Sequence, residues 1–127
     1  SLDIRHQDDA IREQARQALY EQARRIEGQR QVVLDWQLTQ ENRTVSCNPR
    51  LIHMLEQAIE ETGNPVLTLS SGAGHDAVVM NKLTDVAMLF VRCAGGISHN
   101  PAEAVMEEDV AVAIAVLERF LIGVKML

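Results

Sequence analysis

The chain has 127 residues, which is the length of one ordinary domain or of parts of two, and enough to bury a hydrophobic core. Acidic residues outnumber basic ones by 18 to 12, and the resulting net charge of −6 argues against nucleic acid as a partner. No apolar run approaches the roughly 20 residues that span a bilayer, and no basic-then-apolar leader is present, so we expect a cytoplasmic protein without membrane contact.

The first forty residues alternate between strand-like and helical patterns. Residues 1–6 place Leu2 and Ile4 against polar neighbours, which predicts a short strand with one solvated face. Residues 7–28 predict a helix that ends at Gly28. One face of this helix carries Ile11, Ala15, Ala18, Leu19, Gln22 and Ile26. Residues 31–40 return to alternation, so this part of the chain predicts a β-α-β unit with the helix on a sheet.

A polar connector at residues 40–49 leads into a second series of elements. Asn48 is a natural N-cap with Pro49 at the first helical position, so a helix is expected to run to Gly63 with Leu51, Leu55, Ala58 and Ile59 buried. His53 falls on its other face and is expected to be solvated. Residues 64–70 predict a strand, followed by a glycine-containing loop and a helix to about residue 81.

The last third of the chain repeats the strand, loop and helix order. Residues 85–91 are apolar throughout, which predicts a strand buried on both faces. A second glycine loop leads to a helix at 107–124 that is apolar on nearly every side, so that other polypeptide is expected to cover it. The whole pattern predicts an α/β fold. Cys47 and Cys93 lie far apart without a CxxC pair, which indicates reduced thiols, with a disulfide as the alternative.

Each glycine loop contains one histidine, His75 or His99, directly after a predicted strand. Loops that follow neighbouring strands meet at one edge of an open α/β sheet, where ligands bind. Asp76 and Glu103 could orient the two imidazoles. Spacing alone leaves a binding site and two ordinary solvated histidines equally open. Two imidazoles do not complete a zinc site, and Ser71 lies too close to His75 in sequence to form a hydrolase triad with it.

Three motifs in this order carry a resemblance: LDIRH at 2–6, SGAGHDA at 71–77 and GISHNPAE at 96–103. Together they resemble the C-terminal part of the N-carbamoyl-L-amino acid hydrolases and allantoate amidohydrolases. These enzymes belong to the metal-dependent aminoacylase and carboxypeptidase superfamily. The resemblance implies a fragment of a two-domain metallohydrolase. Residues 1–43 would be the β-α-β, C-terminal part of an inserted lid and dimerisation domain, and residues 44–127 the C-terminal strand-helix part of the catalytic domain.

The resemblance also implies roles for individual residues. His99 matches a metal ligand, and Arg5 matches the lid arginine that binds the substrate carboxylate. Gly72 and Ala73 match the loop whose backbone lines the substrate pocket. His75 and Asp76 belong to the same loop signature, where contact with the substrate and support of the loop are equally open, and Glu103 would support the His99 loop. The family pattern has glutamine where this chain has Val78, and Pro-Ser where it has Arg92 and Cys93. These departures remove no ligand but could change the shape of the pocket.

The resemblance implies a centre with two metal ions, which could be Zn, Mn, Co or Ni. In this family the remaining ligands and the general base come from an N-terminal part that this chain lacks. The implied function is therefore that of one portion of an amidohydrolase that cleaves the carbamoyl or ureido C–N bond of N-carbamoyl-L-amino acids or allantoate. This portion has no catalytic residue of its own and would be inactive by itself. The implied partners are the N-terminal part, a small substrate with a carboxylate, and a second copy through the lid. The alternatives are an aminoacylase or dipeptidase of the same superfamily, and a non-catalytic dimerisation or binding module.

Overall fold

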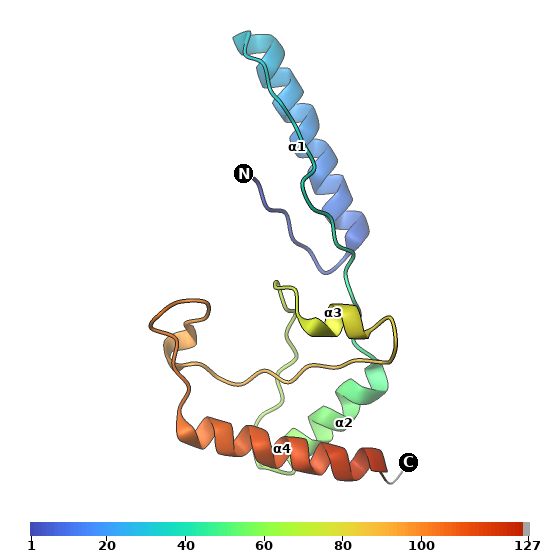
Figure 1. Ribbon diagram of the computed structural model, residues 1–127, viewed down its shortest axis with the longest axis vertical. Coiled ribbons are helices and arrows are strands. Elements are labelled where there is room, and N and C mark those ends of the chain that lie inside the picture. The colour runs from blue at the N-terminus through green and yellow to red at the C-terminus, as the bar shows by residue number, and fades with distance from the viewer. Residues whose placement is uncertain (126–127) are drawn as a thin grey trace. The chain divides into compact units, whose positions relative to one another are not determined.

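The computed structural model describes residues 1–125 and divides them into two compact units (Figure 1). The first unit contains residues 1–46 and 70–74, and the second contains residues 47–69 and those from 75 onward. The helices are α1 (Asp9–Arg30), α2 (Pro49–Glu60), α3 (Asp76–Met80) and α4 (Glu107–Lys125), with a 3-10 turn η1 (Ala94–Gly96) before α4. No helix within the described residues combines the length and the low charge needed to cross a membrane.

The prediction of an α/β fold was wrong. Residues 1–6, 31–40, 64–70 and 85–91, which carry the strand patterns, contain no β-strand in the structure. The reason is that alternation in sequence reports only which side chains share a face, whereas a strand exists through hydrogen bonds to a neighbouring strand. Throughout residues 1–125, the backbone ladder that would join these segments into a sheet is absent.

Helix α1 forms the main element of the first unit and begins at Asp9, two residues after the predicted start. The Asp8 carboxylate accepts hydrogen bonds from the backbone N–H groups of Ala10 and Ile11, and Asp9 adds negative charge to the first turn. The predicted end was wrong, because the helix continues through Gly28 to Arg30. It stops where Gln31 adopts the left-handed conformation, at φ 52°.

Residues 31–44 run back along α1 and contact it through side chains (Figure 1). Glu27 accepts a hydrogen bond from the backbone N–H of Leu34 at 3.0 Å, and the rings of Tyr20 and Trp36 meet edge to face with centroids 5.5 Å apart. The helix face that is partly covered includes Arg12, Arg16, Tyr20, Ala23 and Glu27. The apolar face of α1 was expected to lie on a sheet, and this prediction was wrong, since Ile11, Leu19 and Ile26 are exposed.

The core of the second unit lies where α2 packs against α4. Asn48 caps α2 by accepting from the N–H groups of Arg50 and Leu51, and Pro49 opens the helix, as predicted. The buried residues are Leu55, Ala58 and Val116, and partly buried apolar neighbours surround them: Ile59, Ala87, Leu89, Val112 and Phe120. His53 is exposed on the other face, which confirms its predicted place.

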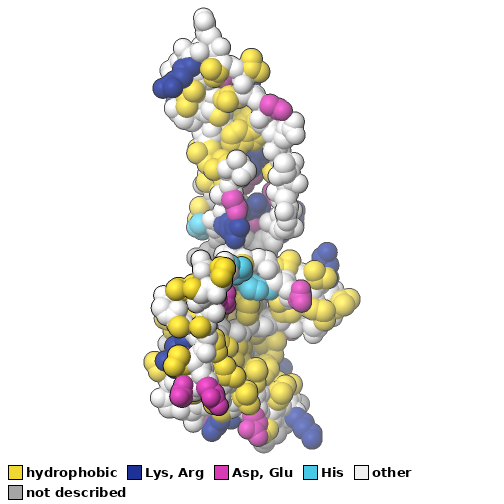
Figure 2. Space-filling model, turned by 60° about the vertical axis from the view of Figure 1, so that its left-hand side comes forward, with side chains coloured by type: hydrophobic (Ala, Val, Ile, Leu, Met, Phe, Trp, Pro, Cys, Tyr) yellow, Lys and Arg dark blue, Asp and Glu magenta, His cyan; other side chains and the backbone are white. Residues whose placement is uncertain are grey.

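Helix α4 is covered on one side only. Val116 is 2% exposed against α2, and Gly123 faces the Met54 side chain, whose terminal methyl would make an ordinary contact of 3.5 Å with a Cβ at that position. A second stripe on the helix is exposed and consists of Val110, Ile114, Leu117, Leu121 and Val124. Figure 2 shows exposed apolar side chains, in yellow, over much of the visible surface. Residues 85–91, predicted to be buried on both faces, bury Val86 but expose Phe90 and Val91.

Replacing Val116 by alanine is expected to lower the free energy of unfolding of the second unit by about 2 kcal/mol, because two buried methyl groups leave a cavity between α2 and α4. The matched control is Ile114→Ala on the same helix, where the side chain is 61% exposed and the loss should stay below about 0.5 kcal/mol. Urea unfolding followed by circular dichroism measures both. Equal losses in the two variants would contradict the observed packing.

Candidate functional site

Arg5 and Gly72, two residues predicted to bind substrate, are brought together in the first unit. The Arg5 Nη1 group donates a hydrogen bond to the backbone carbonyl of Gly72 at 2.5 Å, although 67 residues separate them in sequence. A second contact joins the same segments, because the Ser70 hydroxyl donates to Gln7 Oε1. The beginning of the glycine loop is therefore fastened to the N-terminal segment that carries Arg5.

The guanidinium of Arg5 is also held from its other side. Its Nε donates to Asp3 Oδ2 at 2.9 Å and its Nη2 contacts the same oxygen. The hydrogen bond from Arg5 holds the pKa of the Asp3 carboxyl below its ordinary value, and the same bond raises the pKa of Arg5. Both groups stay charged at neutral pH, and the Arg5 side chain is 61% exposed to solvent.

The glycine loop itself turns at Ser71 and leads into α3. The Ser71 hydroxyl donates to the Ala73 carbonyl and accepts from the Ala73 N–H, each at 3.2 Å, which forms a tight local turn. His75 lies at the N-cap position of α3 with extended backbone, and Asp76 begins the helix. Val78, one of the departures from the family pattern, is half-buried in α3.

His99 lies in a loop of the second unit whose two ends are joined. The Ala94 N–H donates to the Ala104 carbonyl at 2.7 Å, which closes residues 94–104. His99 itself has φ 57°, an uncommon left-handed conformation for a residue with a side chain. The Glu103 carboxylate accepts from the His99 N–H at 2.7 Å and so stabilises this conformation.

The other departures from the family pattern both make contacts near this loop. The Cys93 thiol lies 3.9 Å from Glu103 Oε1, within reach of a weak hydrogen bond, so that Glu103 contacts both sides of the loop. Arg92 forms an ion pair with Asp109 in the first turn of α4. Cys47 and Cys93 are both free of disulfides, as predicted.

The loop of residues 94–104 contains one imidazole, that of His99, that could bind a metal ion. The His99 side chain is exposed, its Nδ1 lies 2.7 Å from the Ser98 hydroxyl, and no described residue engages its Nε2. Across the described part of the chain, however, no three His, Cys, Asp or Glu side chains converge as a metal site. By itself His99 offers a metal ion a single imidazole nitrogen, one donor where a zinc site commonly has three or four protein ligands.

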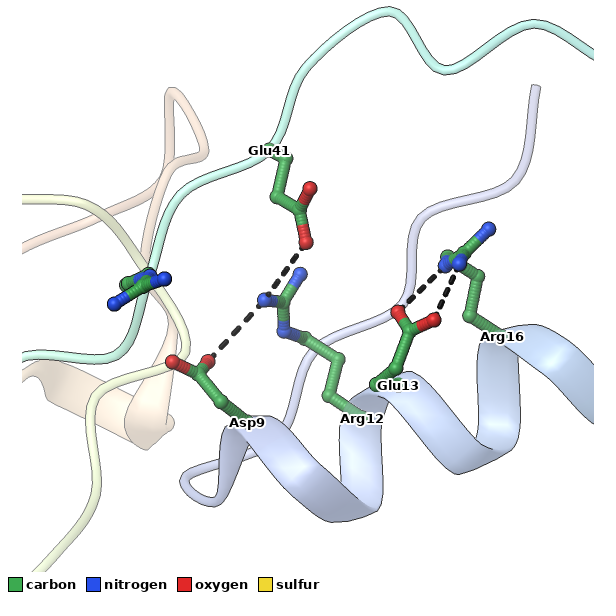
Figure 3. A pocket seen from close by; sticks show the side chains of 6 residues that line it. Asp9, Arg12, Glu13, Arg16 and Glu41 are labelled. Atoms are coloured by element: carbon green, nitrogen blue, oxygen red, sulfur yellow. Dashed lines mark hydrogen bonds and ion pairs between the residues drawn. The ribbon is translucent and has the colours of Figure 1, made fainter.

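A polar pocket on α1 was not predicted from the sequence (Figure 3). Its volume is about 530 Å³, and it is lined by Asp9, Arg12, Glu13, Arg16, Glu41 and Arg43. Arg12 bridges Asp9 at 3.2 Å and Glu41 at 3.3 Å, while Glu13 pairs with Arg16. The i,i+3 spacing of the pairs within α1 is the signal that could have predicted them. Three carboxylates balance three guanidiniums, so the pocket has no excess charge to attract an ion.

Thr44 is hydrogen-bonded to Asp9, one of the residues that line this pocket. The Thr44 N–H and hydroxyl donate to Asp9 Oδ1, both at 3.1 Å. The backbone hydrogen bond from Thr44 lowers the pKa of Asp9, and its hydroxyl and the charge of Arg12 act in the same direction. These contacts fasten the end of the returning segment to the start of α1 and give the pocket a structural role.

The sequence is similar to several hydrolases. It is 38% identical to "Allantoate deiminase" of Arabidopsis thaliana over 93% of this chain and 24% of that protein. It is 36% identical to "N-carbamoyl-L-amino acid amidohydrolase" of Geobacillus stearothermophilus, over 91% of this chain and 28% of the relative. "Allantoate amidohydrolase" of Escherichia coli is 31% identical over 92% of this chain and 28% of its own length.

The chain thus spans about a quarter of the length of the curated relatives it matches. The family described as "Peptidase family M20/M25/M40" matches residues 6–123, a range that includes the glycine loop and the His99 loop. Three short motifs predicted the same group of relatives, and that prediction is confirmed. Because the match covers nearly the whole chain, the protein belongs to peptidase family M20/M25/M40.

Proposed function

We propose that this chain is the C-terminal part of a cytoplasmic, metal-dependent amidohydrolase that cleaves the carbamoyl or ureido C–N bond of N-carbamoyl-L-amino acids or allantoate. The observation that carries the proposal is the His99 loop. It holds an exposed imidazole in a left-handed backbone conformation with one ring nitrogen occupied and the other open. The names of the relatives supply the substrate class.

In this proposal His99 is one ligand of a centre with two divalent ions. When bound, such ions supply Lewis-acid activation of the substrate carbonyl and of water. Glu103 supports the His99 loop by holding the His99 N–H and contacting Cys93. The other ligands and the general base belong to a preceding part of a longer polypeptide, which agrees with a chain that spans about a quarter of its relatives.

The substrate carboxylate would be bound by Arg5 on the first unit, which is proposed to be the C-terminal part of the lid and dimerisation domain. Gly72 and Ala73 would line the substrate pocket with their backbone, with His75 beside them and Asp76 supporting the loop. The contact between Arg5 and the Gly72 carbonyl supports a shared role for these two segments. The boundary near residue 43 and the homodimer are part of the same proposal.

Hydrolysis by the 127-residue chain and by the full-length polypeptide tests the proposal directly. With N-carbamoyl-L-amino acids or allantoate and Mn²⁺ or Co²⁺ present, we expect turnover by the full-length protein and none above background by the 127-residue chain, since the latter contributes one ligand. Ammonia release measures both reactions. Robust turnover by the 127 residues alone would contradict it, and no turnover by either protein would favour a non-catalytic module.

Peptide hydrolysis is the second candidate function. The description of the family as peptidases favours it, because a peptide bond and a ureido C–N bond need the same metal chemistry. Dipeptides and N-acyl amino acids belong in the same assay. A larger kcat/KM for dipeptides than for the carbamoyl compounds would indicate a dipeptidase, and a larger kcat/KM for N-acyl amino acids would indicate an aminoacylase.

A further inference from the structure

Ser98 lies beside the proposed metal ligand and has no role in the proposal so far. Its hydroxyl oxygen is 2.7 Å from Nδ1 of His99, within hydrogen-bond distance. The neighbouring Glu103 carboxylate is already used by the His99 N–H, so it fixes the backbone of the loop. Among the described residues, the Ser98 hydroxyl is the group within hydrogen-bond distance of the imidazole ring.

A neutral imidazole has one N–H and one lone pair, and only the nitrogen with the lone pair can bind a metal ion. If Nδ1–H donates to Ser98 Oγ, the lone pair lies on Nε2, the nitrogen that no described residue engages. Histidines that bind metals through one nitrogen donate the N–H of the other to a hydrogen-bond acceptor, which fixes both the tautomer and the direction of the ring.

We propose that Ser98 is a positioning residue for the metal centre: its hydroxyl accepts the Nδ1–H of His99 and so presents Nε2 to a divalent ion. This inference rests on the proposed function, in which His99 is a ligand. The left-handed backbone held by Glu103 sets where the ring begins, and Ser98 sets which way it faces. One contact thus restrains the backbone of His99 and the other restrains its ring.

The test measures the affinity of the full-length polypeptide for Co²⁺ by competition with a chelator, so that it does not depend on turnover. His99→Ala identifies the ion that this residue binds, because that ion is lost in the variant. For the same ion, Ser98→Ala is expected to weaken the affinity by roughly 10- to 100-fold, as for other residues that hydrogen-bond to metal-binding histidines. Ser98→Thr keeps the hydroxyl and is the matched control. We expect its Co²⁺ affinity to remain within about threefold of the parent protein.

An unchanged affinity in Ser98→Ala, or equal losses in the alanine and threonine variants, would overturn the role of the hydroxyl while leaving His99 as a ligand. If His99→Ala itself retains all of its Co²⁺, the proposed ligand role fails, and that result is distinct from the failure of Ser98 alone. Nitrogen-15 NMR of labelled histidine adds a second readout. The metal-free parent protein should show the Nδ1–H tautomer for His99, and Ser98→Ala should reduce its population.

Discussion

Replacing His99 by alanine in the full-length polypeptide is expected to remove one bound divalent ion and to lower kcat by about 10³-fold or more. A Lewis-acid ion contributes several kcal/mol to the transition state, and each 1.4 kcal/mol corresponds to tenfold in rate. Within the described loop of residues 94–104, the His99 imidazole is the nitrogen donor that could bind a metal ion, because its Nε2 has no hydrogen-bond partner among the described residues. Metal content by mass spectrometry and hydrolysis of N-carbamoyl amino acids measure the two effects.

His53→Ala is the matched control for this experiment. His53 is an exposed histidine on α2 that lies 3.6 Å from Glu56, and it has no place in the proposed centre. Its replacement should leave both the metal content and kcat within about twofold, as expected for a surface substitution. Full metal content and full turnover in His99→Ala would contradict the ligand role, and with it the central element of the proposed function.

The helices were predictable because the signals that form them are local. Asp8 and Asn48 cap α1 and α2 through hydrogen bonds to N–H groups two and three residues away, and the sequence shows such residues directly. The strands were not predictable in the same way. Leu38 alternates with the polar residues Gln37 and Thr39, yet it is 61% exposed, because the pairing partner of a strand lies elsewhere in the chain and no local pattern specifies it.

The partly covered face of α1 shows a second limit of periodicity. Ile11 and Leu19 mark the apolar face, but the segment that returns along the helix contacts Arg12, Tyr20 and Glu27 instead. The side of α1 that the returning segment covers is the side that pairs Arg12 with Glu41 and Tyr20 with Trp36. Both contacts depend on the positions of Glu41 and Trp36 in that segment. The spacing of apolar residues along one helix contains no information about these distant partners.

The candidate site was predictable to a similar degree. The motif at 96–103 identified His99 and Glu103, and the structure joins them through the His99 N–H. The contact between Ser98 and the imidazole depends on side-chain rotamers and on the positive φ of His99, which the sequence does not encode locally. The contact between Arg5 and Gly72 depends on the fold, since the two residues are far apart in the chain.

Arg5→Lys is expected to reduce kcat/KM of the full-length polypeptide by about 10- to 150-fold for substrates with a carboxylate, mainly through KM. The estimate follows from the roughly 1.5–3 kcal/mol that a hydrogen bond to a charged group contributes. A guanidinium has five N–H donors, and three of those of Arg5 are used by Asp3 and Gly72. One N–H on each of Nη1 and Nη2 remains for a carboxylate, and an ammonium cannot reproduce this pair.

Arg24→Lys is the control, because Arg24 lies on α1, pairs with Glu27 and keeps its positive charge after the change. We expect its kcat/KM to match that of the parent protein. A substrate whose carboxylate is replaced by a carboxamide gives a stricter comparison. It should react poorly with the parent protein and no worse with Arg5→Lys, since the interaction that the variant loses is already absent. If Arg5→Lys weakens both substrates equally, Arg5 acts by fastening the glycine loop through Gly72, and the substrate carboxylate is bound by another group.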